Sequence, residues 1–295
     1  MIFPRITAPF LAFAALACAP IATAGPGCAE TGSPIVLPRE LGETSGVAVG
    51  RLDPTVSWTH NDGDSDLYAL DRGGAIRARF DLSVRLEDWE DLEIAPCVMG
   101  GNCLYLADTG DNGERRPGGE IRILRLAEPE VTANEPARSL AVDVFPIRLP
   151  DGPRDIEALF VLPGEVPYLV TKGGRDAISV YRYPPPLRPD TVTLEEVQRL
   201  TEGSVPLLDR VSGAAAAPDG SRIVVRTYQA LQFYRMVADT LARVEGGFVN
   251  LRTQQEIQGE AVSIGPDGSV VLTSEGGPLG GPPSMRVLRC SVGAA

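Results

Sequence analysis

The stretch ETSGVAVGRLDPTVSWTHNDGDSDLYALDRGGAIRARFDL (residues 43–82) decides the fold of this 295-residue chain. It holds four β-rich runs, SGVAV, VSWTH, LYALD and IRARFDL, and the segments between them contain Gly, Asp and Pro. Short runs with alternating apolar residues indicate strands, and Gly, Asp and Pro between them indicate turns. The stretch therefore predicts a meander of four antiparallel strands.

The same unit recurs five times along the chain. The copies begin with the motifs SGVAV at Ser45, EDLEI at Glu90, IEALF at Ile156, SGAAA at Ser212 and GEAVS at Gly259. Aligning the motifs places in one column Gly46, Asp91, Glu157, Gly213 and Glu260, at spacings of 45, 66, 56 and 47 residues. Repeats of this length are typical of propeller blades. The longest spacing leaves room for a sixth, minimal blade.

We therefore predict an all-β protein, a single β-propeller of four-stranded blades with five blades by repeat count. The fifth unit ends with MRVLRCSV (residues 285–292) and lacks a fourth strand. The segment PIVLPREL (residues 34–41) precedes the first unit and can supply that strand. A ring closed by its N-terminal strand has no exposed strand edges, which otherwise promote aggregation.

The cysteines fit this closure. Cys28 lies just before the closing strand and Cys290 lies in the strand it would join, so we expect a Cys28–Cys290 disulfide. Cys97 and Cys103 bracket the turn VMGGN, so we expect a second disulfide there. Disulfides are typical of exported proteins, and the chain contains no C-x-x-C pair that would favour zinc.

The first 24 residues have the pattern of a secretory signal peptide. A single Arg5 precedes an apolar run, and Ala22-Thr23-Ala24 matches a cleavage site. We expect cleavage after Ala24, which divides the chain into a signal peptide (residues 1–24) and a propeller domain (residues 25–295). No later run reaches the roughly 18 apolar residues that a membrane span needs. We therefore expect an exported protein, periplasmic or extracellular, with no membrane span.

The net charge restricts the partners. The formal charge is −12, with 39 acidic residues against 27 basic ones and a single lysine, Lys172. Nucleic acids and anionic membrane surfaces bind clustered Lys and Arg, so the acidic balance argues against both. We expect the partner to be a small polar or anionic ligand or an unidentified protein. The sequence does not indicate an oligomeric state.

Several motifs resemble a known group of proteins. They are ETSGVA, WTHNDG, LYALD, WEDLEIAPC, LYLADTGDN, IEAL, LVTK and QGEAV, and they span residues 42–290. The chain resembles secreted bacterial β-propellers of the TolB-like, esterase-like-phytase and SdiA-regulated type. Related propellers such as gluconolactonases bind a divalent cation at the mouth of the central channel. The resemblance thus implies a cation site at that mouth.

The propeller geometry predicts which residues meet at the channel. The start of the first strand and the end of the second strand of each blade converge at one mouth of the channel. The starts are the column given above, and the ends are Asn61, Asp108, Lys172, Arg226 and Glu275. This gathers five carboxylates and two cations, and calcium takes six to eight oxygen ligands. The sequence therefore predicts a divalent cation, with Ca²⁺ the expected ion.

The candidate site residues divide by chemistry. The candidate metal ligands are Asp91, Glu157, Glu260 and Glu275, and Glu157 and Glu260 are also the candidate catalytic bases. The candidate ligand-binding residues are His60, Asn61, Asp62, Asp108, Asp111, Asn112, Lys172, Arg226 and Tyr228. A structural alternative stays open, because acidic residues at strand starts also accept hydrogen bonds from the backbone of a neighbouring blade.

The loop after His60, the only histidine, allows two interpretations. Asp62, Asp64 and Asp66 are spaced like the start of a calcium-binding EF-hand loop. Leu67 then occupies the position of the required Gly, so a complete EF-hand is excluded. The loop is then either a solvated turn, which the sequence favours, or an irregular Ca²⁺ contact. His60 and Asn61 point to opposite sides of the strand, so only one faces the channel. If that residue is Asn61, His60 packs between blades.

Two functions remain open at this point. The first is an exported propeller that binds a small polar or anionic ligand, with a divalent cation, at the charged mouth of its channel. The alternative is a metal-dependent hydrolase of phosphate esters or lactones, in which Glu157 or Glu260 acts as the base. In that hydrolase Lys172 and Arg226 hold an anionic substrate. The chain has no G-x-S-x-G, H-E-x-x-H or Walker motif.

Overall fold

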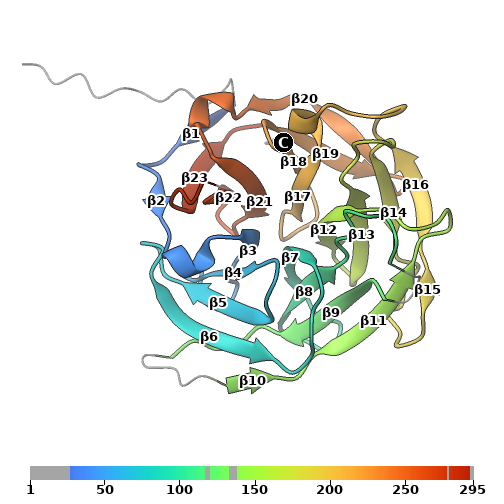
Figure 1. Ribbon diagram of the computed structural model, residues 1–295, viewed down its shortest axis with the longest axis horizontal. Coiled ribbons are helices and arrows are strands. Elements are labelled where there is room, and N and C mark those ends of the chain that lie inside the picture. Colours follow the sequence, from blue (N-terminus) through green and yellow to red (C-terminus); the bar gives the residue numbers. More distant parts are fainter. Residues whose placement is uncertain (1–26, 117–119, 133–137, 278, 293–295) are drawn as a thin grey trace, which may run out of the picture.

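The computed structural model describes residues 27–116, 120–132, 138–277 and 279–292, so the predicted signal peptide lies outside the described residues. Within these ranges the chain forms five β-sheets. Figure 1 shows them arranged in a ring, with one strand of each sheet nearest the centre. The predicted five-bladed propeller is confirmed, and no sixth sheet occurs between the second and third units of the described chain.

Each blade is a meander of four antiparallel strands, with its inner strand first. Blade 1 contains β3 (Thr44–Val49), β4 (Ser57–Asn61), β5 (Asp66–Leu70) and β6 (Ile76–Leu82). Blade 2 contains β7 (Trp89–Pro96), β8 (Asn102–Asp108), β9 (Arg122–Ala127) and β11 (Asp143–Arg148). Blade 3 contains β12 (Ile156–Leu162), β13 (Val166–Thr171), β14 (Ser179–Arg182) and β16 (Glu195–Arg199).

The last two blades have the same order. Blade 4 contains β17 (Val211–Ala216), β18 (Ile223–Thr227), β19 (Ala230–Val237) and β20 (Thr240–Asn250). Blade 5 contains β21 (Gln258–Ile264), β22 (Ser269–Glu275), β23 (Ser284–Cys290) and the N-terminal strands β1 (Cys28–Glu30) and β2 (Ile35–Val36). Short 3-10 helices occur in three connections: η1 (Arg39–Leu41), η2 (Leu207–Asp209) and η3 (Arg252–Gln254). In the described part of the chain we find no helix of the length and apolarity that a membrane crossing requires.

The apolar core lies between neighbouring blades. The described residues form five buried clusters, and each cluster joins side chains of two adjacent sheets. Between blades 1 and 2 its largest members are Trp58, Phe80 and Trp89. All six residues of the inner strand β3 are buried, whereas the outer strand β6 alternates between buried and exposed residues. Burial between sheets therefore explains why alternation is clear only in the outer strands.

The ring is closed by the N-terminal segment, as predicted, but by two short strands. Strand β1 pairs antiparallel with β23, with Cys28 opposite Cys290, and these cysteines form the predicted disulfide. Of the predicted closing segment, only β2 forms a strand, because Pro34 and Pro38 cannot donate ladder hydrogen bonds. The predicted Cys97–Cys103 disulfide is also present.

Two short strands that precede the fourth strands of blades 2 and 3 pair with the blade before. Strand β10 (Arg138–Leu140) pairs in parallel with β6 of blade 1, and β11 then begins in blade 2. In the same way β15 (Val192–Thr193) pairs in parallel with β11 of blade 2 before β16 joins blade 3. These short strands cover the outer edges of blades 1 and 2 and tie each to the blade that follows.

All five inner strands shift register near their first residues. The last pairs before the shift are Thr44–Asn61, Trp89–Asp108, Ile156–Thr171, Val211–Thr227 and Gly259–Ser274. The residues that follow these pairs form the structural column: Ser45, Glu90, Glu157, Ser212 and Glu260. The column expected from the sequence was wrong by one residue in units 1, 2 and 4. A one-residue shift moves a side chain to the other face of a strand, so Glu90 replaces Asp91 in the column.

Asp91 and Glu93 of β7 brace the inner strands across the ring. Asp91 Oδ2 accepts hydrogen bonds from the backbone N–H of Leu159 in blade 3 (2.8 Å) and of Ala214 in blade 4 (3.1 Å). Glu93 Oε2 accepts one from Ala216 N–H, also in blade 4, at 2.7 Å. Blades 2 and 4 are not neighbours, so these side chains cross near the axis. Asp91 thus follows the structural alternative, in which an acidic residue at a strand start accepts backbone hydrogen bonds from other blades.

His60 packs between blades 1 and 2. It is fully buried, and its ring stacks on Trp89 with 3.8 Å between centroids. A Cβ atom at Gly46 would lie 2.3 Å from His60 Nε2, so this contact requires glycine. Burial lowers the pKa of His60 to about 3, and the imidazole is therefore neutral. The backbone O of Asn61 lies 3.1 Å from Nδ1.

The Asp91→Ala substitution is predicted to destabilise the fold. It leaves the buried N–H groups of Leu159 and Ala214 without their acceptor, and each such loss costs about 1–3 kcal/mol. We expect the free energy of unfolding in urea, with disulfides intact, to fall by about 2–4 kcal/mol. The exposed Asp190→Ala is the matched control and should change it by less than about 0.5 kcal/mol. Equal free energies of unfolding for the two variants would show that the hydrogen bonds of Asp91 across the ring do not stabilise the fold.

The His60→Leu substitution is predicted to change the pH dependence of stability. The pKa of His60 is about 3 in the folded state and about 6.5 in the unfolded state, so only the unfolded chain gains a proton as the pH falls below 6.5. Wild type should therefore lose about 3 kcal/mol relative to His60→Leu between pH 7 and pH 4. The comparison uses urea unfolding at several pH values. Parallel curves for the two proteins would show that His60 is not buried as a neutral group.

Candidate functional site

Three glutamates of the structural column line the mouth of the channel. Glu90, Glu157 and Glu260 come from the inner strands of blades 2, 3 and 5 and are 8%, 3% and 5% exposed. The corresponding residues of blades 1 and 4 are serines. Their hydroxyls donate across the blade interfaces, Ser45 to Glu90 O and Ser212 to Glu260 O. The serines thus fix the backbone of two glutamates whose carboxyl groups face the mouth.

A second column is formed by the residues two positions before each member of the structural column. It consists of Glu43, Asp88, Asp155, Arg210 and Gln258. Residues i and i+2 of a strand point the same way, so the two columns meet. The side chains of Asp88 and Glu90 share a hydrogen bond, as do those of Asp155 and Glu157. Gln258 Nε2 donates to Glu260 Oε1 at 2.7 Å.

Within the part of the chain that the structure describes, Glu90, Asp155 and Glu157 form a group of carboxylates close enough to hold a metal ion. All three are buried, and one oxygen of each lies within 4.8 Å of the others. Gly110 makes room for them, since a Cβ atom there would lie 2.2 Å from Glu90 Oε1. The Asp88–Glu90 and Asp155–Glu157 pairs lie next to each other, and carboxyl groups this close cannot all be ionised because their negative charges repel. The group therefore needs shared protons or a cation.

Lys172 supplies one positive charge to this group. It follows strand β13, and its Nζ lies 2.6 Å from Glu157 Oε1 and 3.3 Å from Asp155 Oδ2. It also donates to Asn112 Oδ1 at 3.2 Å. Burial lowers the pKa of Lys172, but the charges of Glu157 and Asp155 raise it more, so the amine stays protonated. The only lysine of the chain is thus held by this cluster of carboxylate side chains.

The remaining acidic side chains surround this centre and disfavour one another's ionisation. Burial, followed by neighbouring charges, raises the pKa of Glu275 to about 7 and that of Asp62 to about 6. Burial is also the main cause that raises the pKa of Glu157 to about 8. The pKa values of Glu90 and Glu260 are raised well above the usual range for the same reason. The mouth therefore holds protons at neutral pH that a cation would displace.

Tyr228 extends the rim of the mouth. It follows β18 and is half-buried. Burial, and then the charge of Glu260, raises its pKa, so the phenol keeps its proton and can donate a hydrogen bond into the mouth. Beside the carboxylates lies a polar hollow of about 180 Å³, lined among others by Asn112, Lys172 and Arg210.

Several predicted ligand-binding residues shape the mouth from behind. Asp108 is fully buried, where it accepts hydrogen bonds from Asp88 N–H (3.1 Å) and pairs with Arg116 and Arg122. Asp111 donates its N–H to Asp155 Oδ1 at 2.7 Å. These contacts hold Asp88 and Asp155 in position.

Asn61 and Arg226 also have structural partners. The side chain of Asn61 bonds Glu40 O and Asp64 Oδ2, at 2.9 and 3.1 Å. Arg226 is fully buried and joins blades 4 and 5, donating to Ala261 O (2.6 Å) and pairing with Glu256. The structure therefore places Arg226 in a blade interface, as it does His60, and Asp91 in the axial brace.

Sequence reasoning missed Asp88, Asp155 and Glu43 as members of the mouth. Their signal was the acidic residue two positions before the column residue, in ETS (43–45), DWE (88–90) and DIE (155–157). An alignment centred on Asp91 instead of Glu90 hides this repeat. A structural register was needed to reveal it.

Comparisons with known proteins show the fold and no specific family. No family model matches the chain, and no curated protein matches its sequence. Among solved structures, the PQQ-bound aldose sugar dehydrogenase of Streptomyces coelicolor is 12% identical, with 92% of this chain and 99% of that chain covered and a TM-score of 0.50. Streptogramin B lyase (13% identity, 88% and 97% covered, TM-score 0.43) and the calcium-binding protein regucalcin of Agrobacterium tumefaciens (13%, 88% and 92%, 0.39) are more distant. The chain is similar to bacterial β-propellers in fold.

Proposed function

We propose that the mouth of the propeller binds a divalent cation, Ca²⁺, and through it a small polar or anionic ligand. The observation that carries this proposal is the buried group of Glu90, Asp155 and Glu157, whose oxygens lie within 4.8 Å of one another. Ca²⁺ prefers six to eight oxygen ligands, and carboxylates are its usual protein ligands. Softer metals prefer imidazole or thiolate, but His60 lies in a blade interface and the described cysteines form disulfides.

The ligand set of this proposal differs from the set expected from the sequence. Glu157, Glu260 and Glu275 stay candidates, since each faces the mouth and perturbs its neighbours. Glu90 takes the place of Asp91, whose oxygens already accept three backbone N–H groups. Asp155 joins the set through its contact with Glu157.

An anionic ligand fits only with the cation in place. Eight acidic side chains surround the mouth, so the protein alone repels anions there. A bound cation reverses the local charge and can complete its coordination with oxygens of the ligand. The polar hollow beside Glu90, Asp155 and Glu157 is lined by Lys172, Arg175 and Arg210 as well as by Glu114 and Asp155. Its three basic side chains suit an anion next to the cation. Asn112 also lines the hollow, and Tyr228 can donate a hydrogen bond at the rim of the mouth.

We also propose that the protein works outside the cytoplasm. Two disulfides support this location, because disulfides persist in oxidising compartments. Ca²⁺ sites of moderate affinity fill readily there, since extracellular modules bind Ca²⁺ with dissociation constants of about 10⁻⁴–10⁻³ M. Detection of the protein in the periplasm or medium, shortened by residues 1–24, tests this part.

Hydrolysis of phosphate esters or lactones is the second candidate function. Burial raises the pKa of Glu157 to about 8 in the cation-free protein, so this carboxyl group can exchange a proton near neutral pH. This function makes a demand that binding does not: the Ca²⁺-loaded protein must turn over a phosphate ester or lactone, and Glu157→Gln must abolish turnover.

Thermal unfolding tests the cation site. In excess EDTA, then with Ca²⁺ at 100 times its dissociation constant, we expect a stabilisation of about 2.7 kcal/mol. The Glu90→Gln and Glu157→Gln substitutions should each abolish this shift, whatever their effect in EDTA. The exposed Glu245→Gln is the matched control and should keep it. If neither Ca²⁺ nor Mg²⁺ shifts the wild type, the proposal fails.

Replacement of Lys172 tests whether its ammonium competes with the cation. Because Nζ lies between Glu157 and Asp155, Ca²⁺ must displace it, and Lys172→Met should bind Ca²⁺ at least about tenfold more tightly. Isothermal titration calorimetry measures the change. The exposed Arg188→Met removes the same charge elsewhere and should leave affinity nearly unchanged. Weaker binding by Lys172→Met would instead show that the lysine supports the site.

A further inference from the structure

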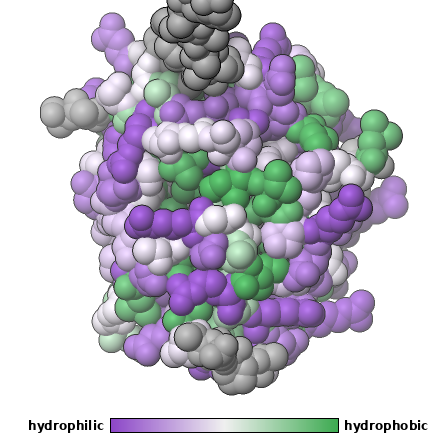
Figure 2. All heavy atoms as spheres, turned by 90° about the vertical axis from the view of Figure 1, so that its left-hand side faces the viewer, coloured by the Kyte–Doolittle hydropathy of each residue, from purple (hydrophilic) through white to green (hydrophobic). Residues whose placement is uncertain are grey.

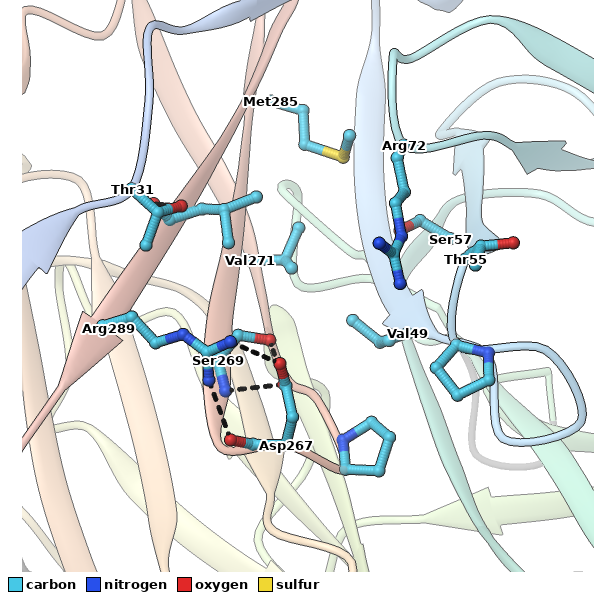
Figure 3. A pocket seen from close by; sticks show the side chains of 13 residues that line it. Thr31, Val49, Thr55, Ser57, Arg72, Asp267, Ser269, Val271, Met285 and Arg289 are labelled. Carbon is cyan, nitrogen blue, oxygen red and sulfur yellow. Dashed lines mark hydrogen bonds and ion pairs between the residues drawn. The ribbon is translucent and has the colours of Figure 1, made fainter.

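A cavity of about 630 Å³ lies at the seam where the ring closes, between blades 5 and 1. Its walls come from strands on both sides of the seam, among them β3 and β4 of blade 1 and β22 and β23 of blade 5, as Figure 3 shows. Thr31, which follows the closing strand β1, also lines it. None of the carboxylates at the mouth lines this cavity. It is therefore separate from the proposed cation site.

The floor of the cavity is apolar. Val49, Val271 and Met285 belong to the buried cluster between blades 5 and 1 and reach the cavity from that side. Val287 adds a partly buried apolar wall. Figure 2 looks onto the side of the molecule that carries β2 and β23, and apolar surface gathers in the middle of this face between hydrophilic side chains. A ligand here would bury apolar groups, which is favourable in water.

Two arginines, Arg289 and Arg72, reach the cavity from opposite walls. Arg289 is already neutralised, because it pairs with Asp267 at 2.7 Å and also donates to its backbone O. Asp267 in turn accepts hydrogen bonds from Ser269. The wall on the side of blade 5 therefore offers no free charge.

Arg72 lies in the turn between β5 and β6 and makes no hydrogen bond or ion pair with any residue that the structure describes. Hydrogen bonds from Thr55 are the main cause that lowers the pKa of Asp53, with Arg77 and then Arg72 adding to it, and the carboxylate of Asp53 pairs with Arg77 at 3.6 Å. Figure 3 shows the guanidinium group of Arg72 extended along the blade 1 wall towards Val49. The cavity thus combines an apolar floor with one guanidinium group that has no hydrogen-bonded partner.

We propose that this seam cavity binds a small organic anion with an apolar body, of the chemical class of a medium-chain carboxylate. The apolar body packs on Val49, Val271 and Met285, and the carboxylate pairs with Arg72. Arginine matches this partner because its guanidinium binds a carboxylate with two parallel hydrogen bonds. The bound molecule contacts both blades and so stabilises the closure of the ring.

The occupant is a free small molecule. The volume lies within the range of about 300–1,000 Å³ that is typical of small-molecule sites. An anionic membrane surface offers the same chemistry, but the net charge of −12 opposes it. The anion complements the one unpaired charge of the cavity.

Fluorescence of anilinonaphthalene sulfonate, an anionic probe with an apolar body, tests the proposal. We expect the intact protein to bind the probe, decanoate to displace it, and neutral decanol to displace it at least about tenfold less well. Arg72→Gln should weaken displacement by decanoate about tenfold and leave that by decanol unchanged. Arg235→Gln, an exposed arginine of blade 4, is the matched control.

Two more variants locate the binding of the probe. Val287→Trp, which fills the cavity from its partly buried wall, should abolish binding of both probe and decanoate. Glu157→Gln and added EDTA should leave binding of the probe unchanged. A failure of the proposed cation site would therefore not count against the seam cavity. Equal affinities of wild type and Arg72→Gln for decanoate would overturn the proposal. Cosedimentation with anionic vesicles, lost in Arg72→Gln, would overturn it in favour of a membrane surface.

Discussion

The hydrogen bonds of the Asp91 carboxylate to the inner strands of two other blades are the interaction on which the rest of the structure depends. This carboxylate accepts a backbone N–H group from each of them, and Glu93 repeats the contact one pleat further along. These hydrogen bonds tie the inner strand of blade 2 to the inner strands of blades 3 and 4 across the ring of five sheets. The carboxyl groups at the mouth are themselves buried, which is the main cause of their raised pKa values.

Charge at the mouth is out of balance. Eight acidic side chains face Lys172 and the arginines of the hollow, Arg175 and Arg210. Arg116, Arg122 and Arg226 are already paired with Asp108 and Glu256 in holding loops and blades together. Such an arrangement costs folding free energy, because buried like charges repel one another. Shared protons, Lys172 and a divalent cation relieve the same repulsion, so they compete. The proposed affinity for Ca²⁺ therefore depends on Lys172, whose ammonium group competes with the cation.

The two proposed sites have opposite chemistry. The mouth offers oxygen ligands to a hard cation, whereas the seam cavity offers apolar surface and one free guanidinium to an organic anion. They also depend on different parts of the fold. The mouth follows from the register of inner strands, and the cavity follows from ring closure by β1 and β2, which joins the two ends of the chain beside the Cys28–Cys290 disulfide.

The sequence by itself determined the propeller, its five blades, its closure and both disulfides. Strand alternation and turn residues are local signals, and their repetition identifies blades without knowledge of contacts. The sequence also predicted that Glu157, Glu260 and Lys172 lie at the mouth. Only the tertiary structure decided that Glu90 lies there and Asp91 does not, and that His60 and Arg226 are buried between blades. The physical reason is the register shift in each inner strand: one extra residue reverses the side-chain direction, and hydrophobic patterning does not encode that residue.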